Sequence, residues 1–222
     1  MRRLTSLALA GIAWAGLVAL YGCSASTKTS SRTPEVTGPI KVEIDLNDPA
    51  LSFGVLPQGE SRTIFKVGYG KNGVTCPGSR FEEGYTPLGR FKVNAILSNK
   101  RFEMDPKLIA QSGKTERELR QTLFQNMNSI DFNGDGEVGE YGSGYISLMP
   151  EGSTQQPFRF NTYGGKFRWY SFAIHGSNND KRIGQRVTGG CVNVAEPTLR
   201  TLLSSVKLGD TVVVSANGPC TP

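Results

Sequence analysis

The residues best suited to covalent chemistry are a single histidine and a cysteine that follows it. His175 is the only histidine in the chain of 222 residues, and it ends an apolar run before Gly176. Cys191 follows in the segment Val187-Thr-Gly-Gly-Cys-Val-Asn193. An imidazole beside a thiol can accept the thiol proton, and the sulfur can then attack a carbonyl carbon. The pair therefore predicts acyl transfer, with Cys191 as the nucleophile and His175 as the base.

The main chain around Cys191 adds two features that favour this chemistry. The Gly189-Gly190 pair leaves the backbone free to present N–H groups to a developing oxyanion. A helix is expected soon after Cys191, and its dipole together with the imidazole predicts a lowered thiol pKa. The alternative for His175 or Cys191 taken alone is a structural role in the core, because geometry is not given by sequence.

The elements that must position these residues are expected to be mainly strands. Runs of alternating apolar and polar residues, separated by Gly, Pro and Asn, indicate half-buried strands. The expected strands are 41–46, 51–56, 63–67, 91–97, 145–149, 158–163, 167–175 and 211–215. Helices are expected at 114–128 and 196–206, where leucines repeat on one face. The predicted fold is mainly β, a sandwich or barrel with a few helices.

The first residues resemble a secretion signal. Arg2 and Arg3 precede an uncharged apolar run, which ends in Leu20-Tyr21-Gly22-Cys23. This ending resembles a bacterial lipobox, so residues 1–22 are predicted to be a lipoprotein signal peptide and Cys23 the lipidated residue. Cleavage without lipidation and retention as a membrane anchor are the alternatives. A Ser-, Thr- and Pro-rich tether is expected over 23–39, and one domain over 40–222.

The charge of the chain limits the choice of partner. Its formal net charge is +6, and it falls to +4 once Arg2 and Arg3 leave with the signal peptide. A mildly basic domain suits an anionic polymer such as the cell wall. Basic runs with interleaved aromatic residues are missing from the sequence, which argues against nucleic acid.

The histidine–cysteine segment resembles the signature of the L,D-transpeptidase catalytic domain family. In that pattern a His-Gly is followed by a spacer and then by Ser/Thr-His-Gly-Cys-x-Asn or -Arg. His175-Gly176 matches the first part, and Thr188, Gly190, Cys191 and Asn193 match the second. The segment Tyr85-Thr-Pro-Leu-Gly-Arg-Phe-Lys-Val93 is similar to the Thr-Pro-x-Gly-x-Phe element of the family. One departure is clear: the family's second histidine is Gly189 here.

The resemblance implies a two-step reaction on peptidoglycan stem peptides that needs no catalytic cofactor. Cys191 would form a thioester at the third residue, releasing the terminal D-residue, and an amine acceptor would then complete a cross-link. The resemblance implies that the Gly176 carbonyl orients His175 and that N–H groups near Gly190 and Cys191 bind the oxyanion. Substrate contacts would fall to Thr188, Gly189 and Asn193. The location implied is the cell envelope, lipid-anchored and facing the periplasm or cell wall.

Two other functions stay open at this point. If water resolves the thioester, the same site is an L,D-carboxypeptidase or hydrolase. The replacement of the family histidine by Gly189 also allows a lipid-anchored peptidoglycan-binding module with weak or lost catalysis.

Two cysteines remain after the motif and the lipobox. Cys76 and Cys220 have no other assignment, and in an oxidising compartment two such cysteines are expected to pair. Two free thiols are the alternative.

A possible calcium loop follows the first predicted helix. In Asp131-Phe-Asn133-Gly-Asp135-Gly136-Glu137-Val138 the oxygen ligands alternate as in an EF-hand. The Glu137 carbonyl would be the next ligand, and Glu140 would supply the closing carboxylate because Gly142 stands at position twelve. The prediction is a structural Ca²⁺ site within an insertion at 104–144 that shapes the substrate cleft. The alternative is a turn that binds nothing.

Overall fold

The computed structural model describes residues 35–152 and 158–222. The predicted signal peptide, Cys23 and most of the tether lie outside these residues. The tether prediction is wrong at its end, because Val36 pairs with Gln58 and the Thr37 N–H donates to the Pro57 carbonyl (3.1 Å). Val36 is apolar and packs against the core, which explains why the chain is already ordered there. Of the helices described, none combines the length and apolar character needed to cross a membrane.

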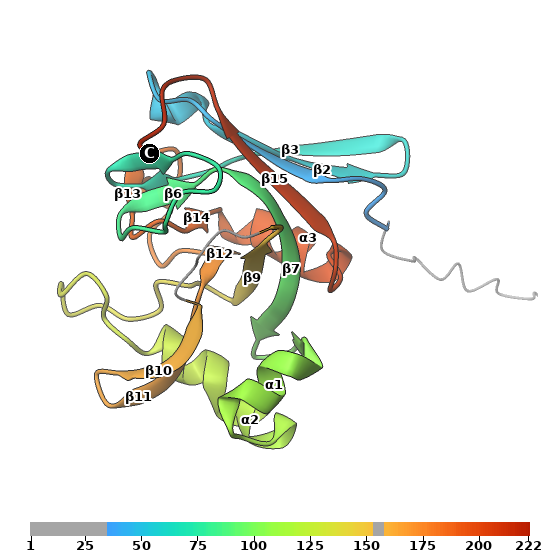
Figure 1. Ribbon diagram of the computed structural model, residues 1–222, viewed down its shortest axis with the longest axis vertical. Helices are drawn as coiled ribbons and strands as arrows, with labels where there is room; N and C mark the ends of the chain where they lie inside the picture. Colours follow the sequence, from blue (N-terminus) through green and yellow to red (C-terminus); the bar gives the residue numbers. More distant parts are fainter. Residues whose placement is uncertain (1–34, 153–157) are drawn as a thin grey trace, which may run out of the picture. The chain divides into compact units, whose positions relative to one another are not determined.

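The described residues form a mainly β fold, as predicted, built on one curled mixed sheet (Figure 1). The strand order is β14-β12-β9-β7-β15-β1-β2-β3, and β8 pairs with β7. Neighbours are antiparallel except for two parallel pairs, β1 with β15 and β12 with β14. The strands of this sheet are β1 Ile40–Ile44, β2 Phe53–Gln58, β3 Ser61–Lys66, β7 Gly89–Ser98, β8 Phe102–Met104, β9 Gly144–Pro150, β12 Phe172–His175, β14 Val192–Asn193 and β15 Thr211–Ala216.

Three short strand pairs lie beside the large sheet. They are β4 Tyr69–Gly70 with β13 Arg186–Thr188, β5 Gly73–Thr75 with β6 Tyr85–Pro87, and β10 Arg159–Tyr163 with β11 Lys166–Tyr170. The predicted strand 167–175 is wrong as a single element, because the chain changes sheet at Ser171. The Ser171 carbonyl accepts a hydrogen bond from the Tyr145 hydroxyl (2.8 Å). A side chain from β9 therefore fixes the residue at which the chain leaves β11 and enters β12.

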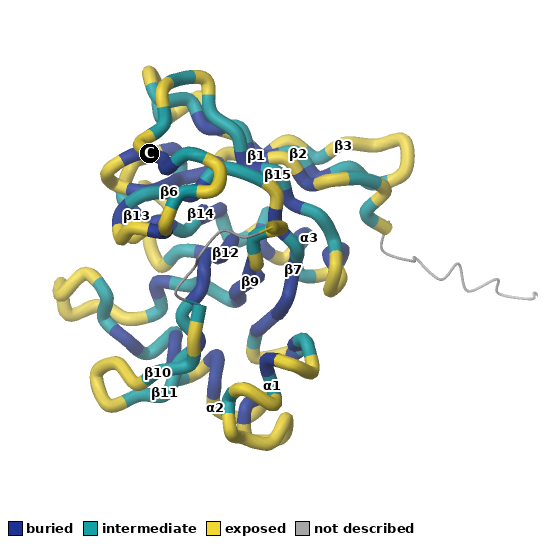
Figure 2. The backbone as a smooth tube through the Cα atoms, in the orientation of Figure 1, coloured by how far each residue is buried: buried dark blue, intermediate teal, exposed yellow. Residues whose placement is uncertain are grey.

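Two clusters of buried side chains lie on opposite faces of the sheet. Along β12, Phe172 and Ile174 belong to one cluster, whereas Ala173 belongs to the other. This alternation follows from strand geometry, since successive side chains point to opposite faces. Figure 2 shows the central strands β7, β9 and β12 as largely buried. The face that carries Ala173 also carries the candidate site.

Each cluster is covered by a helix. Helix α3 (Glu196–Ser205) contributes Leu199 and Leu202 to the first cluster, and α2 (Glu116–Asn128) contributes Leu119, Leu123 and Met127 to the second. Both helices were predicted. A capping box between Thr115 and Glu118 fixes the start of α2, where two side chains satisfy free backbone N–H groups.

Helix α1 (Pro106–Ser112) was not predicted. It buries only Leu108, so it has too little apolar periodicity to be detected. Its signals are the Asp105 cap, Pro106 in the first turn and Gly113 at φ +67° after the end. Short 3₁₀ turns also occur at Pro49–Leu51 and Asp180–Arg182.

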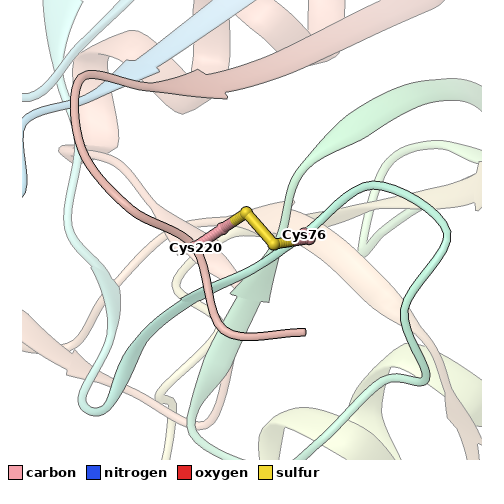
Figure 3. Close-up of a disulfide and its surroundings, with 2 residues drawn as sticks. All are labelled: Cys76 and Cys220. Atoms are coloured by element: carbon pink, nitrogen blue, oxygen red, sulfur yellow. A yellow bond between two sulfur atoms is a disulfide. The ribbon is translucent and has the colours of Figure 1, made fainter.

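The predicted disulfide between Cys76 and Cys220 is present (Figure 3). The two Cα atoms are 4.9 Å apart, and the bond closes a separation of 144 residues. Hydrogen bonds between Cys76 and Thr221 (2.8 Å) and between Thr221 and Val74 (3.1 Å) support it. The C-terminal segment is therefore attached to the β5–β6 region by both covalent and backbone contacts.

Candidate active site

The register of two parallel strands brings the histidine and the cysteine together. His175 ends β12, and Cys191 immediately precedes β14. The register pairs Ile174 with Val192 and His175 with Asn193. Because side chains alternate along a strand, His175 and Cys191 lie diagonally on the same face of the sheet. Both line one cavity of about 180 Å³.

His175 is held in one orientation and one tautomer. Its Nδ1 lies 2.7 Å from the Gly176 carbonyl oxygen, as expected from the resemblance. A carbonyl only accepts, so Nδ1 carries the proton and Nε2 has a free lone pair. The Tyr141 ring meets the imidazole edge-on at 4.8 Å, and the Tyr145 ring stacks parallel to it at 6.1 Å.

Burial keeps His175 neutral. The pKa of His175 is lowered to about 4, chiefly by desolvation; the Gly176 hydrogen bond opposes this change, and the positive charge of Arg182 contributes to it. At neutral pH the ring is therefore an uncharged base whose acceptor nitrogen is available.

The thiol of Cys191 points toward a carbonyl. Its Sγ donates to the Ser171 oxygen at 3.8 Å, and the hydrogen bonds of the described residues include none between Cys191 and His175. Burial raises the pKa of the thiol to about 12; the Ala173 N–H lowers this pKa and the charge of Glu83 raises it. The resting pair is therefore a neutral thiol beside a neutral imidazole.

The predicted lowering of the Cys191 pKa is wrong, and the position of α3 gives the reason. The helix begins at Glu196, and Val192–Asn193 form a strand between it and Cys191. A helix dipole acts mainly within its first turn. The thiol thus lies too far from the helix for the dipole to offset burial.

A buried polar network fixes Ser171, where the chain passes from β11 to β12, beside the thiol. The Tyr145 hydroxyl contacts Ser171 O (2.8 Å) and Oγ (3.1 Å), Ser147 Oγ lies 2.6 Å from Ser171 Oγ, and Trp169 Nε1 donates to Ser147 (3.0 Å). These residues were missed in the sequence. Tyr145 and Ser147 do alternate on one face of a predicted strand, but their partner Ser171 fell within another strand that was expected to be continuous.

The turn before Cys191 is built by hydroxyl groups. Thr188 Oγ1 donates to the Cys191 carbonyl (2.5 Å) and accepts from the Gly190 N–H (3.2 Å). Thr86 Oγ1 donates to the Gly190 carbonyl (2.8 Å). Gly190 has φ +129°, and a Cβ there would lie 2.7 Å from the Tyr85 carbonyl, so only glycine fits.

The residues predicted at this turn take part in its hydrogen bonds. Thr188 shapes the backbone with its hydroxyl and also lines the cavity, so its contact with substrate stays a prediction. The Gly190 N–H is engaged by Thr188, while the Cys191 N–H has no hydrogen-bond partner among residues 35–152 and 158–222. Of these two N–H groups, that of Cys191 is therefore the one available to a ligand. Thr86 belongs to the segment Tyr85–Val93, which is similar to the family's Thr-Pro-x-Gly-x-Phe element. Its hydrogen bond to the Gly190 carbonyl connects that segment to the site.

Gly189 leaves space that a carboxylate fills. A Cβ on Gly189 would lie 2.9 Å from Glu83 Oε1. The Tyr170 hydroxyl donates to Glu83 Oε2 (3.3 Å), and both residues line the cavity with Cys191. Glu83 was missed because it lies in a loop outside every recognised motif.

Asn193 lines the same cavity. Its backbone bonds reciprocally to Gly68 (2.9 and 3.0 Å), and its side-chain Oδ1 is buried without a hydrogen-bond partner in the described chain. A Cβ on Gly68 would overlap that oxygen, so the close approach requires glycine. Asn193 is thus a buried residue of the cavity wall. Its pairing with His175 is part of the strand register that brings His175 and Cys191 together.

The predicted calcium ligands are engaged in other contacts. Asp131 accepts from the backbone N–H groups of Gly134 (2.6 Å) and Gly136 (2.8 Å), which lowers the pKa of this carboxyl. Glu140 accepts from the Phe132 and Asn133 N–H groups. In the described part of the chain no three His, Cys, Asp or Glu side chains are grouped to hold a metal. Calcium binding therefore stays a prediction.

The same loop forms one wall of the cavity. Phe132, Asn133, Glu140 and Tyr141 all line it. Glu140 pairs with Arg182 at 3.4 Å, and the Gly176 N–H donates to the Tyr141 carbonyl (2.9 Å). The loop after α2 thus contacts both the histidine segment and the cleft.

The fold and site define a class of protein that the comparisons identify. The model of the L,D-transpeptidase catalytic domain (YkuD) matches residues 25–214. The chain therefore belongs to the L,D-transpeptidase catalytic domain family. A search of curated proteins found no match.

Several solved structures are similar to this chain. An L,D-transpeptidase from Mycobacterium tuberculosis H37Rv matches with 10% identity, a TM-score of 0.41, and coverage of 79% of this chain and 57% of that one. L,D-transpeptidase 3 from M. tuberculosis, in complex with a faropenem-derived adduct, matches with 11% identity, a TM-score of 0.42 and coverage of 79% and 60%. An L,D-transpeptidase from Xylanimonas cellulosilytica matches with 15% identity, a TM-score of 0.36 and coverage of 82% and 63%. The chain thus spans less than two thirds of each of these proteins.

Proposed function

We propose that this protein is a peptidoglycan L,D-transpeptidase in which Cys191 forms a thioester with a stem peptide and passes it to an amine. The observation that carries the proposal is the geometry of the pair. Cys191 and His175 share one face of the sheet and one cavity, and the Gly176 contact leaves His175 Nε2 as an acceptor. Family membership supplies the substrate class.

The first half-reaction starts from a neutral pair. The thiol must turn from the Ser171 carbonyl toward His175, so that Nε2 takes the proton as Sγ attacks the third-residue carbonyl. General-base transfer suits a thiol whose pKa is raised, because no thiolate is stored beforehand. The Cys191 N–H would bind the oxyanion. When the intermediate collapses, His175 returns the proton to the departing amine of the terminal D-residue.

The second half-reaction decides the product. An amine of a second stem attacks the thioester, the C–N bond forms, the C–S bond breaks, and His175 carries a proton from the nitrogen to the departing sulfur. Water in place of the amine makes the protein an L,D-carboxypeptidase or hydrolase. Incubation with a tetrapeptide fragment distinguishes them: a cross-linked dimer supports transfer, whereas tripeptide and free D-residue alone support hydrolysis.

A binding module with weak or lost catalysis is the second candidate function. It is favoured by two observations, the glycine at position 189 and the raised pKa of the Cys191 thiol. Such a module would bind wall fragments with equal affinity in the wild type and in Cys191→Ala, and would leave the fragments uncleaved.

We also propose that the protein is anchored in the cell envelope through lipidated Cys23, facing the periplasm or cell wall. Support comes from the Leu20-Tyr21-Gly22-Cys23 segment alone. Wild type should partition into detergent after expression in bacteria, and Cys23→Ser should not. Equal partitioning of both would contradict lipidation at this residue.

A further inference from the structure

One carboxylate in the cavity lacks a cationic partner. Glu83 is exposed and lines the cavity with Cys191, and it takes part in no ion pair within the described residues. The other acidic residue of the cavity, Glu140, is buried, pairs with Arg182 (3.4 Å) and accepts two backbone N–H groups. Glu140 is thus satisfied by the protein, whereas Glu83 is available to a ligand.

Glu83 is held close to the nucleophile turn. Its Oε1 lies 2.9 Å from the position a Gly189 Cβ would occupy, and the neighbouring Gly84 N–H donates to the Gly189 carbonyl (2.8 Å). Its Oε2 accepts from the Tyr170 hydroxyl (3.3 Å). Burial and the Glu83 charge raise the pKa of Tyr170, so this hydroxyl stays protonated and continues to donate.

The charge of Glu83 has the wrong sign for the other tasks of the site. A carboxylate near Cys191 disfavours the thiolate, and it would repel the oxyanion of a tetrahedral intermediate. Neither activation of the nucleophile nor stabilisation of the intermediate explains its position. A cation is the partner that an exposed carboxylate in a cavity lining attracts, and an ammonium group adds charge-assisted hydrogen bonds.

We propose that Glu83, positioned by Tyr170, binds a primary ammonium group carried by the third residue of a peptidoglycan stem. This inference rests on the proposed function and names the stem that the site prefers. The geometry fits a donor stem, because the attacked carbonyl belongs to its third residue and must lie at Cys191, beside Gly189. It also fits an acceptor stem, because the acceptor amine must reach the thioester carbon at Cys191. The ammonium can come from the donor stem or from the acceptor stem.

The acceptor case requires a defined path for protons. The bound ammonium first releases one proton to solvent, and the resulting amine attacks the thioester carbon. The C–N bond forms and the C–S bond breaks, while a second proton moves from nitrogen through His175 to the departing sulfur of Cys191. Glu83 binds the ammonium and aligns it, but takes no part in bond making.

The first test measures recognition without chemistry. Calorimetry on Cys191→Ala compares a tetrapeptide whose third residue has a free side-chain amine with the same peptide acetylated at that amine. Addition of Glu83→Gln should weaken binding of the free amine about threefold to tenfold and leave the acetylated peptide unchanged, as expected for a partly exposed ion pair. Glu82→Gln is the matched control, since Glu82 is exposed and lies outside the cavity lining.

The second test separates the two sources of the ammonium. With Cys191 intact, a donor role predicts that Glu83→Gln raises the peptide concentration needed for half-maximal acylation. An acceptor role predicts unchanged acylation and a higher amine concentration for half-maximal aminolysis of the thioester. Tyr170→Phe should shift the same constant in the same direction by a smaller factor.

Three unchanged constants in a folded Glu83→Gln protein, for binding, acylation and aminolysis, would overturn the proposal. Equal losses for the free and acetylated peptides would overturn it too, because the effect would not depend on the ammonium. Failure of the proposed function is distinct from both results: the wild type would then form no thioester, while calorimetry on Cys191→Ala would still report whether the ammonium is recognised.

Discussion

At the scale of single residues, burial decides the protonation states of His175 and Cys191. His175 is 7% exposed, and its ring is in contact with Tyr141 and Tyr145. Burial disfavours charge on both partners, so it lowers the pKa of the histidine and raises that of the Cys191 thiol. The result is a resting pair in which both partners are neutral, unlike a stored thiolate–imidazolium pair.

This state predicts an unusual pH dependence. Nε2 must be unprotonated to act as base, and burial lowers the pKa of His175 from its ordinary value of 6.5 to about 4. The rate of Cys191 acylation by a carbapenem should therefore stay level as pH falls from 7 to about 5, and decrease only as pH approaches the folded-state pKa. Stopped-flow acylation across this range measures it. A decrease centred near pH 6.5 would show that His175 is solvated.

Thr188 is expected to matter for stability as well as for the shape of the turn. Thr188→Val removes the hydroxyl that bonds to the Cys191 carbonyl and the Gly190 N–H, at a buried position. It should lower the free energy of unfolding by about 1–3 kcal/mol, measured by chemical denaturation, and should slow acylation. Thr162→Val is the matched control, because Thr162 is exposed on β10. Equal effects of the two substitutions would contradict this role.

At the scale of elements, much of the fold followed from periodicity. Seven of the eight predicted strands and both predicted helices correspond to single observed elements, since apolar alternation and leucine spacing report the faces that are buried. Elements of two or three residues, such as β4, β13 and β14, contain too few residues for a period. The break at Ser171 depends on the Tyr145 hydroxyl from another strand, which no local pattern of residues 167–175 contains.

The candidate site was likewise predicted only where its residues are close together in sequence. His175, Gly176, Gly190 and Cys191 are contiguous enough in sequence to form a motif, and the motif predicted the contact between His175 and the Gly176 carbonyl. Glu83 and Tyr170 come from separate elements and meet only through the fold. The wrong prediction of the thiol pKa came from the short strand β14, whose two residues separate Cys191 from α3.

The calcium prediction concerns the loop after α2. The ligand spacing from Asp131 to Glu140 predicts that added Ca²⁺ raises the melting temperature, because an ion bound only by the folded state stabilises it. Thermal scans with Ca²⁺ and with chelator measure this shift. Asp135→Asn/Glu140→Gln should abolish the shift if it is specific. An unchanged melting temperature in wild type would leave the loop as a turn and cavity wall.

At the scale of the whole molecule, a covalent bond attaches the C-terminal segment to the β5–β6 region. The disulfide joins Cys76 to Cys220, which is near the C-terminus and packs against the main core. Cross-links of long loops stabilise folded proteins by restricting the unfolded chain. Cys76→Ser/Cys220→Ser should therefore lose about 2–5 kcal/mol of unfolding free energy, measured by denaturation. Cys191→Ala serves as control because it removes a cysteine without breaking the bond; equal losses would contradict the role of the disulfide.

The disulfide and the active-site thiol also divide the cysteines by function. Cys191 is the only free cysteine in the part of the chain that the structure describes. A reagent that reacts with a free thiol in the folded domain is thus expected to modify Cys191 alone, which makes mass analysis of the intact protein unambiguous.

The central claim is that Cys191 forms a thioester with a wall peptide, and intact-mass analysis tests it most directly. The domain is incubated with a purified tetrapeptide fragment or with a carbapenem, with wild type and Cys191→Ala side by side. We predict an adduct on wild type alone, accompanied by release of the terminal D-residue from the fragment. An unmodified wild-type protein and an intact fragment, with the protein shown to be folded, would contradict the claim and favour the binding module.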